Sequence, residues 1–104
     1  MRVVVIGGGA AGFFSAINIA EKHPDWKITI LEKSSKLLSK VKVSGGGRCN
    51  VTNGRSAPAE LVPFYPRGNK KLYSVFKQFS TLDMVDWLSQ RGVSTHMEED
   101  LRMF

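Results

Sequence analysis

Cysteine, histidine and long apolar runs are scarce in this chain, and each shortage excludes a class of protein. A single cysteine, Cys49, cannot form an internal disulfide or a cysteine-rich metal site. The two histidines, His23 and His96, lie far apart and lack partners at metal-ligand spacing. No apolar run approaches the roughly 20 residues that cross a bilayer, and the N-terminus does not fit a signal peptide. We therefore expect a cytoplasmic protein with no metal site and no membrane contact.

Acidic residues are also in the minority. The 104 residues include 15 Lys and Arg and 9 Asp and Glu, so the formal net charge is +6. This balance suits an anionic partner, either nucleic acid or a phosphate-bearing cofactor. Much of the excess lies near two glycine clusters, and the basic segment 33–57 has no aromatic residue that would stack on a base. We therefore favour a cofactor and expect no nucleic-acid partner.

The first third of the chain has the pattern of a β-α-β unit. The β-branched run VVVI at 3–6 predicts a strand buried on both faces of a parallel sheet. Helical spacing continues over 10–22, and the alternating segment WKITILE at 26–32 predicts a second strand. The buried face of the helix is expected to hold Phe13, Ile17 and Ala20. The fold class is therefore α/β, and at this length the chain is at most one small domain.

The remainder is expected to form a long glycine-rich loop, two helices and a terminal hairpin. Residues 33–57 read as an extended loop, with a short helix near Ser35 to Lys40 as the one regular element. The second helix starts at a capping box of Ser80 and Asp83 and ends near Arg91. The helix before it is expected over 70–79, with Asn69 as its cap. Its inward-facing residues are expected to be Leu72, Val75, Phe76 and Phe79. The hairpin occupies 93–104, with its turn near Glu99 and Asp100.

The first glycine cluster, Gly7-x-Gly9-x-x-Gly12, fits the fingerprint of a dinucleotide-binding turn between a strand and a helix. Gly7 permits the tight turn, Gly9 lets a pyrophosphate approach the backbone, and Gly12 lets the helix pack closely on the strand. The helix dipole and the first N–H groups, at Ala10, Ala11 and Gly12, favour a phosphate. The alternative is a tight β-α turn that binds nothing.

An acidic residue stands where the fingerprint requires one. Glu32 ends the second strand, 20 positions after Gly12. A carboxylate there accepts hydrogen bonds from ribose hydroxyls and repels a 2′-phosphate. The sequence therefore predicts an unphosphorylated adenosine ribose, as in FAD or NAD.

The second glycine cluster carries a family resemblance. Together with VVVIGGGAAG and LEK, the segment KVSGGGRCNVTN resembles the BaiN-like (YhiN-like) NAD(P)/FAD-dependent oxidoreductases, also described as the aminoacetone-oxidase family of flavoproteins. The later segments FYPRGNKKLYSVFKQFS, DMVDWLSQRGV and EEDLRMF are similar to the family too. One position departs from the pattern, because many members have glycine where this chain has Leu38.

The resemblance implies that residues 1–104 are the N-terminal portion of an FAD/NAD(P)-binding domain in a much longer protein. FAD would be the cofactor, NAD(P)H an electron donor, and a small organic molecule the substrate. The remaining C-terminal part of the same protein would complete the cofactor site and the parallel sheet, so this chain alone should be inactive. No catalytic acid or base is identified. A non-catalytic dinucleotide-binding module is the alternative.

The resemblance also implies cofactor contacts in the second cluster. Glycines allow close backbone approach, and consecutive N–H groups can form an anion-binding nest. Arg48 would pair with pyrophosphate or polarise the flavin, unless it is simply a solvated arginine. Cys49 is expected to be a packing thiol more than a nucleophile, and Asn50 is equally good as a turn former. The implied binding residues are Gly45, Gly46, Gly47, Arg48, Cys49, Asn50 and Thr52. Independently of the resemblance, we expect Lys40 to add positive charge near the phosphates, and we include Lys33 among the binding residues.

Overall fold

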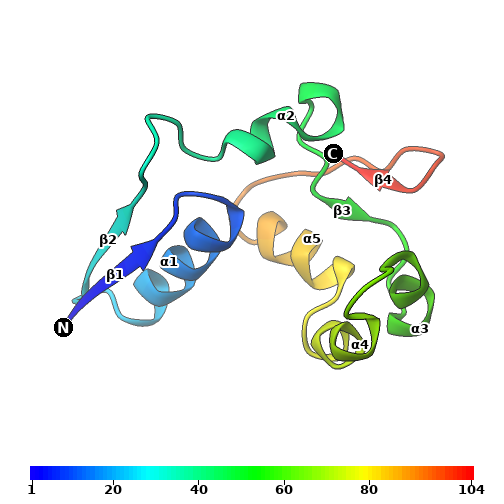
Figure 1. Ribbon diagram of the computed structural model, residues 1–104, viewed down its shortest axis with the longest axis horizontal. Coiled ribbons are helices and arrows are strands. Elements are labelled where there is room, and N and C mark those ends of the chain that lie inside the picture. Colours follow the sequence, from blue (N-terminus) through cyan, green and yellow to red (C-terminus); the bar gives the residue numbers. More distant parts are fainter. The chain divides into compact units, whose positions relative to one another are not determined.

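The computed structural model describes residues 1–104, which divide into two compact units, Met1–Cys49 and Asn50–Phe104 (Figure 1). The first unit contains β1 (Arg2–Ile6), α1 (Ala10–Lys22), β2 (Lys27–Leu31) and α2 (Ser39–Gly47). The second contains β3 (Thr52–Asn53), α3 (Pro58–Leu61), the 3-10 helix η1 (Val62–Phe64), α4 (Asn69–Gln78), α5 (Thr81–Ser89) and β4 (Arg102–Met103). None of these helices has the length and apolar character that crossing a membrane requires.

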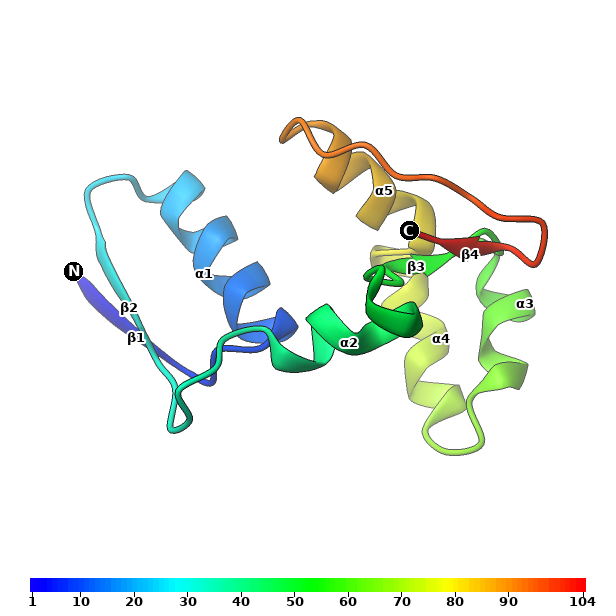
Figure 2. The same ribbon diagram turned by 90° about the horizontal axis from the view of Figure 1, so that it is seen from above.

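The predicted β-α-β unit is confirmed. Strand β1 pairs in parallel with β2, in a register that sets Val4 opposite Thr29. Figures 1 and 2 show the two strands side by side with α1 running along one face of the pair. The carboxyl ends of both strands therefore lie at the same edge of the sheet, where the chain turns into α1 and where β2 leads to Glu32.

The expectation that β1 is buried on both faces is wrong for this chain. Val5 packs toward α1 and is half-buried, whereas Val4 and Ile6 on the opposite face are 57% and 78% exposed. Strand β2 alternates in the same way. A run of β-branched residues does not show which face is covered, and here only one face of the sheet carries a helix.

The buried face of α1 agrees with the prediction only at Phe13, which is half-buried. Ala16 is buried and Gly12 and Ile19 are half-buried, at i, i+4 and i+7 spacing. Ile17 is 37% exposed, and Ala20 is exposed as well. The glycine explains the shift, because Gly12 packs against the carbonyl of Gly7 and turns the small residues of the helix toward the sheet.

Part of the expected loop is helical. Helix α2 begins at Ser39, later than the short helix expected near Ser35 to Lys40, and its first hydrogen bond runs from Lys42 N–H to the Leu38 carbonyl at 3.0 Å. The helical conformation breaks at Ser44, whose ψ is 148°, and glycines follow. The residues SKVKV thus form a short helical segment before the glycine cluster.

The second unit contains the predicted terminal hairpin. His96 and Phe104 exchange two backbone hydrogen bonds of 2.7 and 2.8 Å, and the turn closes with Leu101 N–H donating to the Glu98 carbonyl at 2.9 Å. Glu99 and Asp100 therefore occupy the turn, as expected. The sequence did not reveal that β4 also pairs antiparallel with β3, with Thr52 opposite Met103.

Helix α4 begins differently from the prediction. Gly68, in the left-handed conformation with φ 72°, precedes the helix, so Asn69 is its first residue and not its cap. Leu72 and Phe76 are half-buried as expected, but Val75 is 51% exposed. Phe79, also predicted to face inward, is 37% exposed. The inward stripe is therefore narrower than the apolar pattern indicates.

The predicted capping box of α5 is confirmed. The Ser80 hydroxyl accepts from Asp83 N–H at 3.4 Å, and the Asp83 carboxylate accepts from Ser80 N–H at 2.6 Å. At the other end Gly92 has a φ of 78°, and Val93 N–H donates to the Leu88 carbonyl at 3.0 Å. These bonds satisfy backbone groups that the ends of a helix leave unpaired.

Replacing Ser80 by alanine should lower the free energy of unfolding by about 1 kcal/mol, because the N–H of Asp83 loses its side-chain acceptor. Urea unfolding followed by circular dichroism measures the change. Ser89→Ala is the matched control, since Ser89 is exposed at the last turn of the same helix. Equal stability of the two variants would show that the capping box contributes nothing.

Candidate functional site

The turn between β1 and α1 has the geometry of an anion-binding helix start. Gly7 has a φ of 105° and its N–H donates to the Leu31 carbonyl at 2.7 Å, which ties the turn to the end of β2. Gly9 precedes α1, no side chain caps the helix, and its first turn holds no acidic residue. The N–H groups of Ala10, Ala11 and Gly12 therefore mark the positive end of an uncapped helix dipole.

The three fingerprint glycines occupy different environments. A Cβ on Gly12 would overlap the carbonyl oxygen of Gly7, so only glycine fits between the turn and the helix. A Cβ on Gly9 would meet no atom within 4 Å, and the φ of Gly9 is an ordinary −96°. Gly9 thus faces open space, which is the condition for a ligand to approach the backbone there.

Gly8, which the fingerprint leaves undefined, is the buried residue of the turn. A Cβ on it would lie 2.6 Å from Cδ2 of Leu37 and 3.1 Å from Cβ of Glu32. The Gly8 carbonyl also accepts from Leu38 N–H at 2.8 Å. The sequence analysis did not identify Gly8 as a position where a side chain would not fit. The uninterrupted Gly-Gly-Gly run was the one feature of the sequence that could have indicated it.

The carboxylate of Glu32 joins the end of β2 to the glycine turn. Its Oε1 accepts from Gly8 N–H at 3.0 Å, and its Oε2 accepts from Ser34 N–H at 2.8 Å. The backbone N–H of Ser34 is the main cause that lowers the pKa of Glu32, followed by that of Gly8 and by the Ser34 hydroxyl. A carboxylate has about four lone-pair positions, so each oxygen retains one for a further donor.

The lowered pKa of Glu32 predicts a pH dependence of stability. A carboxyl whose folded pKa lies below its ordinary value of 4.5 stabilises the fold fully above that value, and this contribution is lost as pH falls through the folded pKa. The stability difference between the wild-type chain and Glu32→Gln should be constant near neutral pH and should shrink below pH 4.5. Urea unfolding over this pH range measures it. An unchanged difference at low pH would show that Glu32 makes no such bonds.

A cavity of about 320 Å³ opens beside this turn, within the first unit. It brings together four of the residues expected to bind a cofactor, namely Gly9, Ala10, Glu32 and Lys40. Ser34, Lys36, Leu38 and Ser39 line it as well and were not identified from the sequence. Lys33, by contrast, is exposed and does not line the cavity.

Leu38, the position that departs from the family pattern, adopts the left-handed conformation with φ 53°, which glycine adopts more readily.

The second glycine cluster forms a run of left-handed residues at the end of α2. Gly45, Gly46 and Gly47 have φ values of 59°, 69° and 89°. Cys49 follows with φ 62°, and its N–H donates to the Ser44 carbonyl at 3.1 Å. A Cβ on Gly46 or Gly47 would meet no atom within 4 Å, so these glycines serve the backbone conformation and leave their surroundings open. They do not line the cavity beside Glu32.

The residues that follow the glycine run make mainly structural bonds. Arg48 is exposed, and its Nε donates to the Gly45 carbonyl at 3.4 Å. Cys49 is a half-buried free thiol. With its amide oriented to satisfy both groups, the Asn50 side chain donates to the carbonyls of Met103 and Thr52 at 3.1 and 3.2 Å. Asn50 and Thr52 also line a cavity of about 370 Å³ in the second unit.

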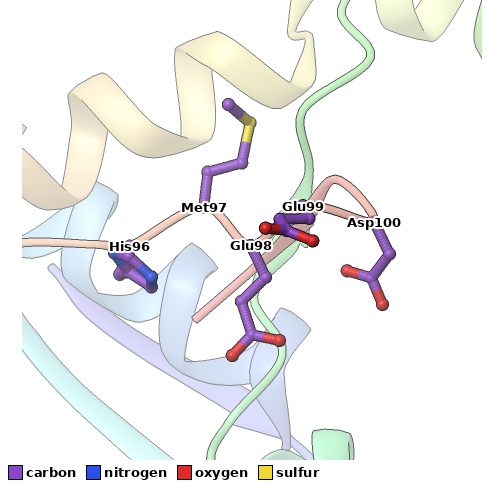
Figure 3. Close-up of a pocket in the computed structure, with 5 residues that line it drawn as sticks. All are labelled: His96, Met97, Glu98, Glu99 and Asp100. Carbon is purple, nitrogen blue, oxygen red and sulfur yellow. The ribbon is translucent and has the colours of Figure 1, made fainter.

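Another hollow in the second unit lies at the turn of the hairpin. Its volume is about 600 Å³ and it is lined by the five residues His96 to Asp100. Figure 3 shows Met97 on the opposite side of the strand from His96 and Glu98. The Asp100 carboxylate accepts from the backbone N–H of Arg102 and pairs with its guanidinium, and these bonds lower the pKa of Asp100. No group of three or more potential ligands in the chain could hold a metal ion.

Comparison with known proteins gives a match over the whole chain. The family described as "HI0933-like protein Rossmann domain" matches residues 1–104. A ribosomal RNA dihydrouridine synthase of Haemophilus influenzae is 30% identical over 101 residues, which cover 97% of this chain and 24% of that protein. A 3-dehydro-bile acid delta(4,6)-reductase of Clostridium scindens is 30% identical over 94 residues, or 90% of this chain and 22% of that protein. A ribosomal RNA dihydrouridine synthase of Escherichia coli is 29% identical over 93 residues, or 89% and 22%.

The chain thus spans about a quarter of the length of these curated relatives. The match extends far beyond the glycine motifs, and it agrees with the parallel β-α-β unit of the structure. The resemblance to the BaiN-like enzymes is confirmed, and this chain belongs to the HI0933-like Rossmann-domain family of flavoprotein oxidoreductases.

Proposed function

We propose that residues 1–104 are the N-terminal portion of an FAD-binding domain and that the first unit holds the ADP half of FAD. The observation that carries this proposal is the bond from Gly8 N–H to the Glu32 carboxylate, at the rim of the 320 Å³ cavity. It sets the acceptor for a ribose next to the turn for a pyrophosphate. In a dinucleotide the ribose and the pyrophosphate are neighbouring groups, and this fold binds them at the acidic residue and at the glycine turn.

Different residues of the cavity would bind different parts of the cofactor. The uncapped start of α1 would receive the pyrophosphate, and the open side of Gly9 would admit it. The remaining lone pairs of Glu32 would accept the ribose hydroxyls, and its charge would disfavour a 2′-phosphate. Lys36 and Lys40 line the same cavity and would add positive potential.

We assign the second glycine cluster to the flavin end of the same cofactor. Within the left-handed run, Gly46 and Gly47 leave their surroundings open for close approach. Arg48 would supply positive charge, Lys33 would add to the surrounding potential, and Asn50 and Thr52 would fix the segment that follows. Cys49 would be a packing residue, since its left-handed backbone and partial burial suit a structural position.

The whole protein is proposed to be an FAD-dependent oxidoreductase. Bound FAD would supply the hydride-transfer chemistry, while the protein supplies binding, orientation and electrostatics. NAD(P)H is the proposed electron donor. No residue of this chain is proposed as a catalytic acid or base, and the chain alone is expected to be inactive. A dinucleotide-binding module without catalysis remains the competing function.

Two substrate classes are in competition. The family resemblance implies a small organic molecule, and one relative is named as a reductase of a bile acid. Two other relatives are named for dihydrouridine synthesis in ribosomal RNA, and the net charge of +6 suits such an anionic substrate.

The proposal is tested on the full-length protein that carries this segment. It should purify with bound FAD, and anaerobic addition of NADH or NADPH should bleach the flavin absorbance. Retention of FAD without reduction by either donor would favour the non-catalytic module. A protein that takes up neither FAD nor NAD would contradict the proposal.

A further inference from the structure

The second unit contains a cavity to which the proposed function assigns no ligand. Its volume is about 370 Å³, within the range of roughly 300–1,000 Å³ that is typical of small-molecule sites. The residues that line it come from β3, α3, α4 and α5 and from the turns that follow η1 and α4. The cavity therefore lies entirely within one compact unit, and segments far apart in the sequence form it.

The apolar residues of this cavity come mainly from the helices. Leu61 of α3 is 6% exposed, and Phe76 of α4 and Met84 of α5 are half-buried. The ring of Phe76 lies 5.7 Å, centre to centre, from that of Tyr65, which lines the cavity too. Aromatic side chains pack favourably against another ring, face to edge or offset. This part of the cavity suits a flat and largely apolar ligand.

The polar residues of the cavity offer hydrogen-bond donors. Oδ1 of Asn53 accepts from the backbone N–H of Arg55 at 2.9 Å and from its guanidinium at 3.5 Å. The amide nitrogen of Asn53, which can only donate, has no partner in the chain. The Thr81 hydroxyl donates to the Arg55 carbonyl at 2.6 Å, whereas the Ser80 hydroxyl accepts from Asp83 N–H and keeps its proton for another acceptor. A ligand with acceptor oxygens would complete these bonds.

No charged residue lines this cavity. The guanidinium of Arg55 instead contacts Asn53 and lies 4.8 Å from the centre of the Phe64 ring. A carboxylate or phosphate in the cavity would lose water without gaining a cation, which costs free energy. The cavity is therefore matched to a neutral ligand.

We propose that this cavity binds a quinone, a neutral planar ring with carbonyl oxygens. The amide nitrogen of Asn53 and the hydroxyl of Ser80 would donate to these oxygens, and Phe76 and Tyr65 would contact the ring. A ring whose polar groups are all acceptors is a better match than a ring that carries N–H groups, because the Asn53 nitrogen can only donate. The inference concerns binding and does not depend on the proposed function.

The experiment measures binding of duroquinone to the full-length protein by isothermal titration, with FAD in excess so that the probe does not occupy the proposed cofactor site. The ring of duroquinone is fully methylated, so the Cys49 thiol has no free ring position to add to. Asn53→Asp keeps the acceptor for Arg55 N–H but removes the donor, and it should weaken duroquinone binding at least about 10-fold. Durene, the same methylated ring without carbonyl oxygens, should lose less than about 2-fold in this variant.

Matched variants locate the site. Asn69→Asp makes the same change at an exposed residue outside the cavity and should bind duroquinone as the wild type does. Met84→Trp should fill the cavity and block both probes, whereas Met84→Leu, which keeps the volume, should not. If Met84→Trp does not fold, the comparison of Asn53→Asp with Asn69→Asp decides.

Absence of duroquinone binding, equal weakening by Asn53→Asp and Asn69→Asp, or displacement of duroquinone by an equal concentration of uridine would overturn the inference. The FAD content of each protein is recorded as well. A protein that contains FAD and binds no duroquinone contradicts this inference alone. Binding of duroquinone in this cavity by a protein that takes up no FAD contradicts the proposed function alone.

Discussion

Valine in place of Gly9 is expected to weaken FAD binding by the full-length protein at least about 100-fold, or roughly 2.7 kcal/mol. A side chain at this position meets no protein atom within 4 Å of its Cβ, and φ is −96°, so the fold tolerates it. The same side chain would occupy the space through which a pyrophosphate reaches the start of α1. Isothermal titration of the apoprotein with FAD measures the affinity.

The companion measurement is the stability of the Gly9→Val apoprotein. Gly9 precedes α1 without a side-chain cap, so its replacement should change the free energy of unfolding by no more than about 1 kcal/mol. Loss of FAD with retained stability identifies a binding position. Unchanged FAD affinity would mean that the cofactor does not approach the β1–α1 turn.

Alanine in place of Gly12 should mainly lower the stability of the fold, whereas Gly9→Val should mainly weaken FAD binding. The added methyl group would overlap the Gly7 carbonyl oxygen, which belongs to the backbone and cannot rotate away. Forcing such a group into a packed site typically costs about 1–3 kcal/mol. This exceeds the roughly 1 kcal/mol by which alanine is favoured over glycine inside a helix. Urea unfolding of the apoprotein measures the net loss.

Ser15→Ala is the control for Gly12→Ala. Ser15 is exposed on the same helix, so its replacement should change stability by less than about 0.5 kcal/mol. Full stability of Gly12→Ala would show that α1 does not pack closely on the turn. The two glycine variants together distinguish a residue that shapes the fold from one that admits the ligand.

The sequence predicts the elements of this chain better than the faces they bury. The bounds of α1 follow from the glycine turn and from apolar spacing that is purely local. Its inward face does not, because the contact between Gly12 and Gly7 decides the rotation of the helix. The same applies to Val4 and Ile6, since an apolar strand shows no sign of which side a helix covers. The sequence predicts the capping box at Ser80 because its two residues, Ser80 and Asp83, lie only three positions apart.

The sequence indicated four of the residues that line the cavity, Gly9, Ala10, Glu32 and Lys40, but not the hydrogen bonds that connect them. The spacing from Gly12 to Glu32 indicated a ribose acceptor, yet nothing local indicated that Gly8 and Ser34 would donate to it. The bond from Gly8 depends on how β1 and β2 pair, whereas the bond from Ser34 forms within the turn that follows β2. Lys36 and Leu38 line the cavity from the irregular turn that follows Glu32, where the sequence predicted a short helix near Ser35 to Lys40. The sequence therefore did not predict the long-range hydrogen bond or the irregular turn of this site.

The central claim is that this segment binds the ADP half of FAD, and a comparison of FAD with FMN tests it most directly. FMN contains the flavin and one phosphate but lacks the adenosine that Glu32 and the α1 turn are proposed to hold. Titration of the full-length apoprotein should give an affinity for FAD at least about 100-fold higher than for FMN, with ADP competing against FAD. Equal affinities for FAD and FMN, with no competition by ADP, would contradict the account.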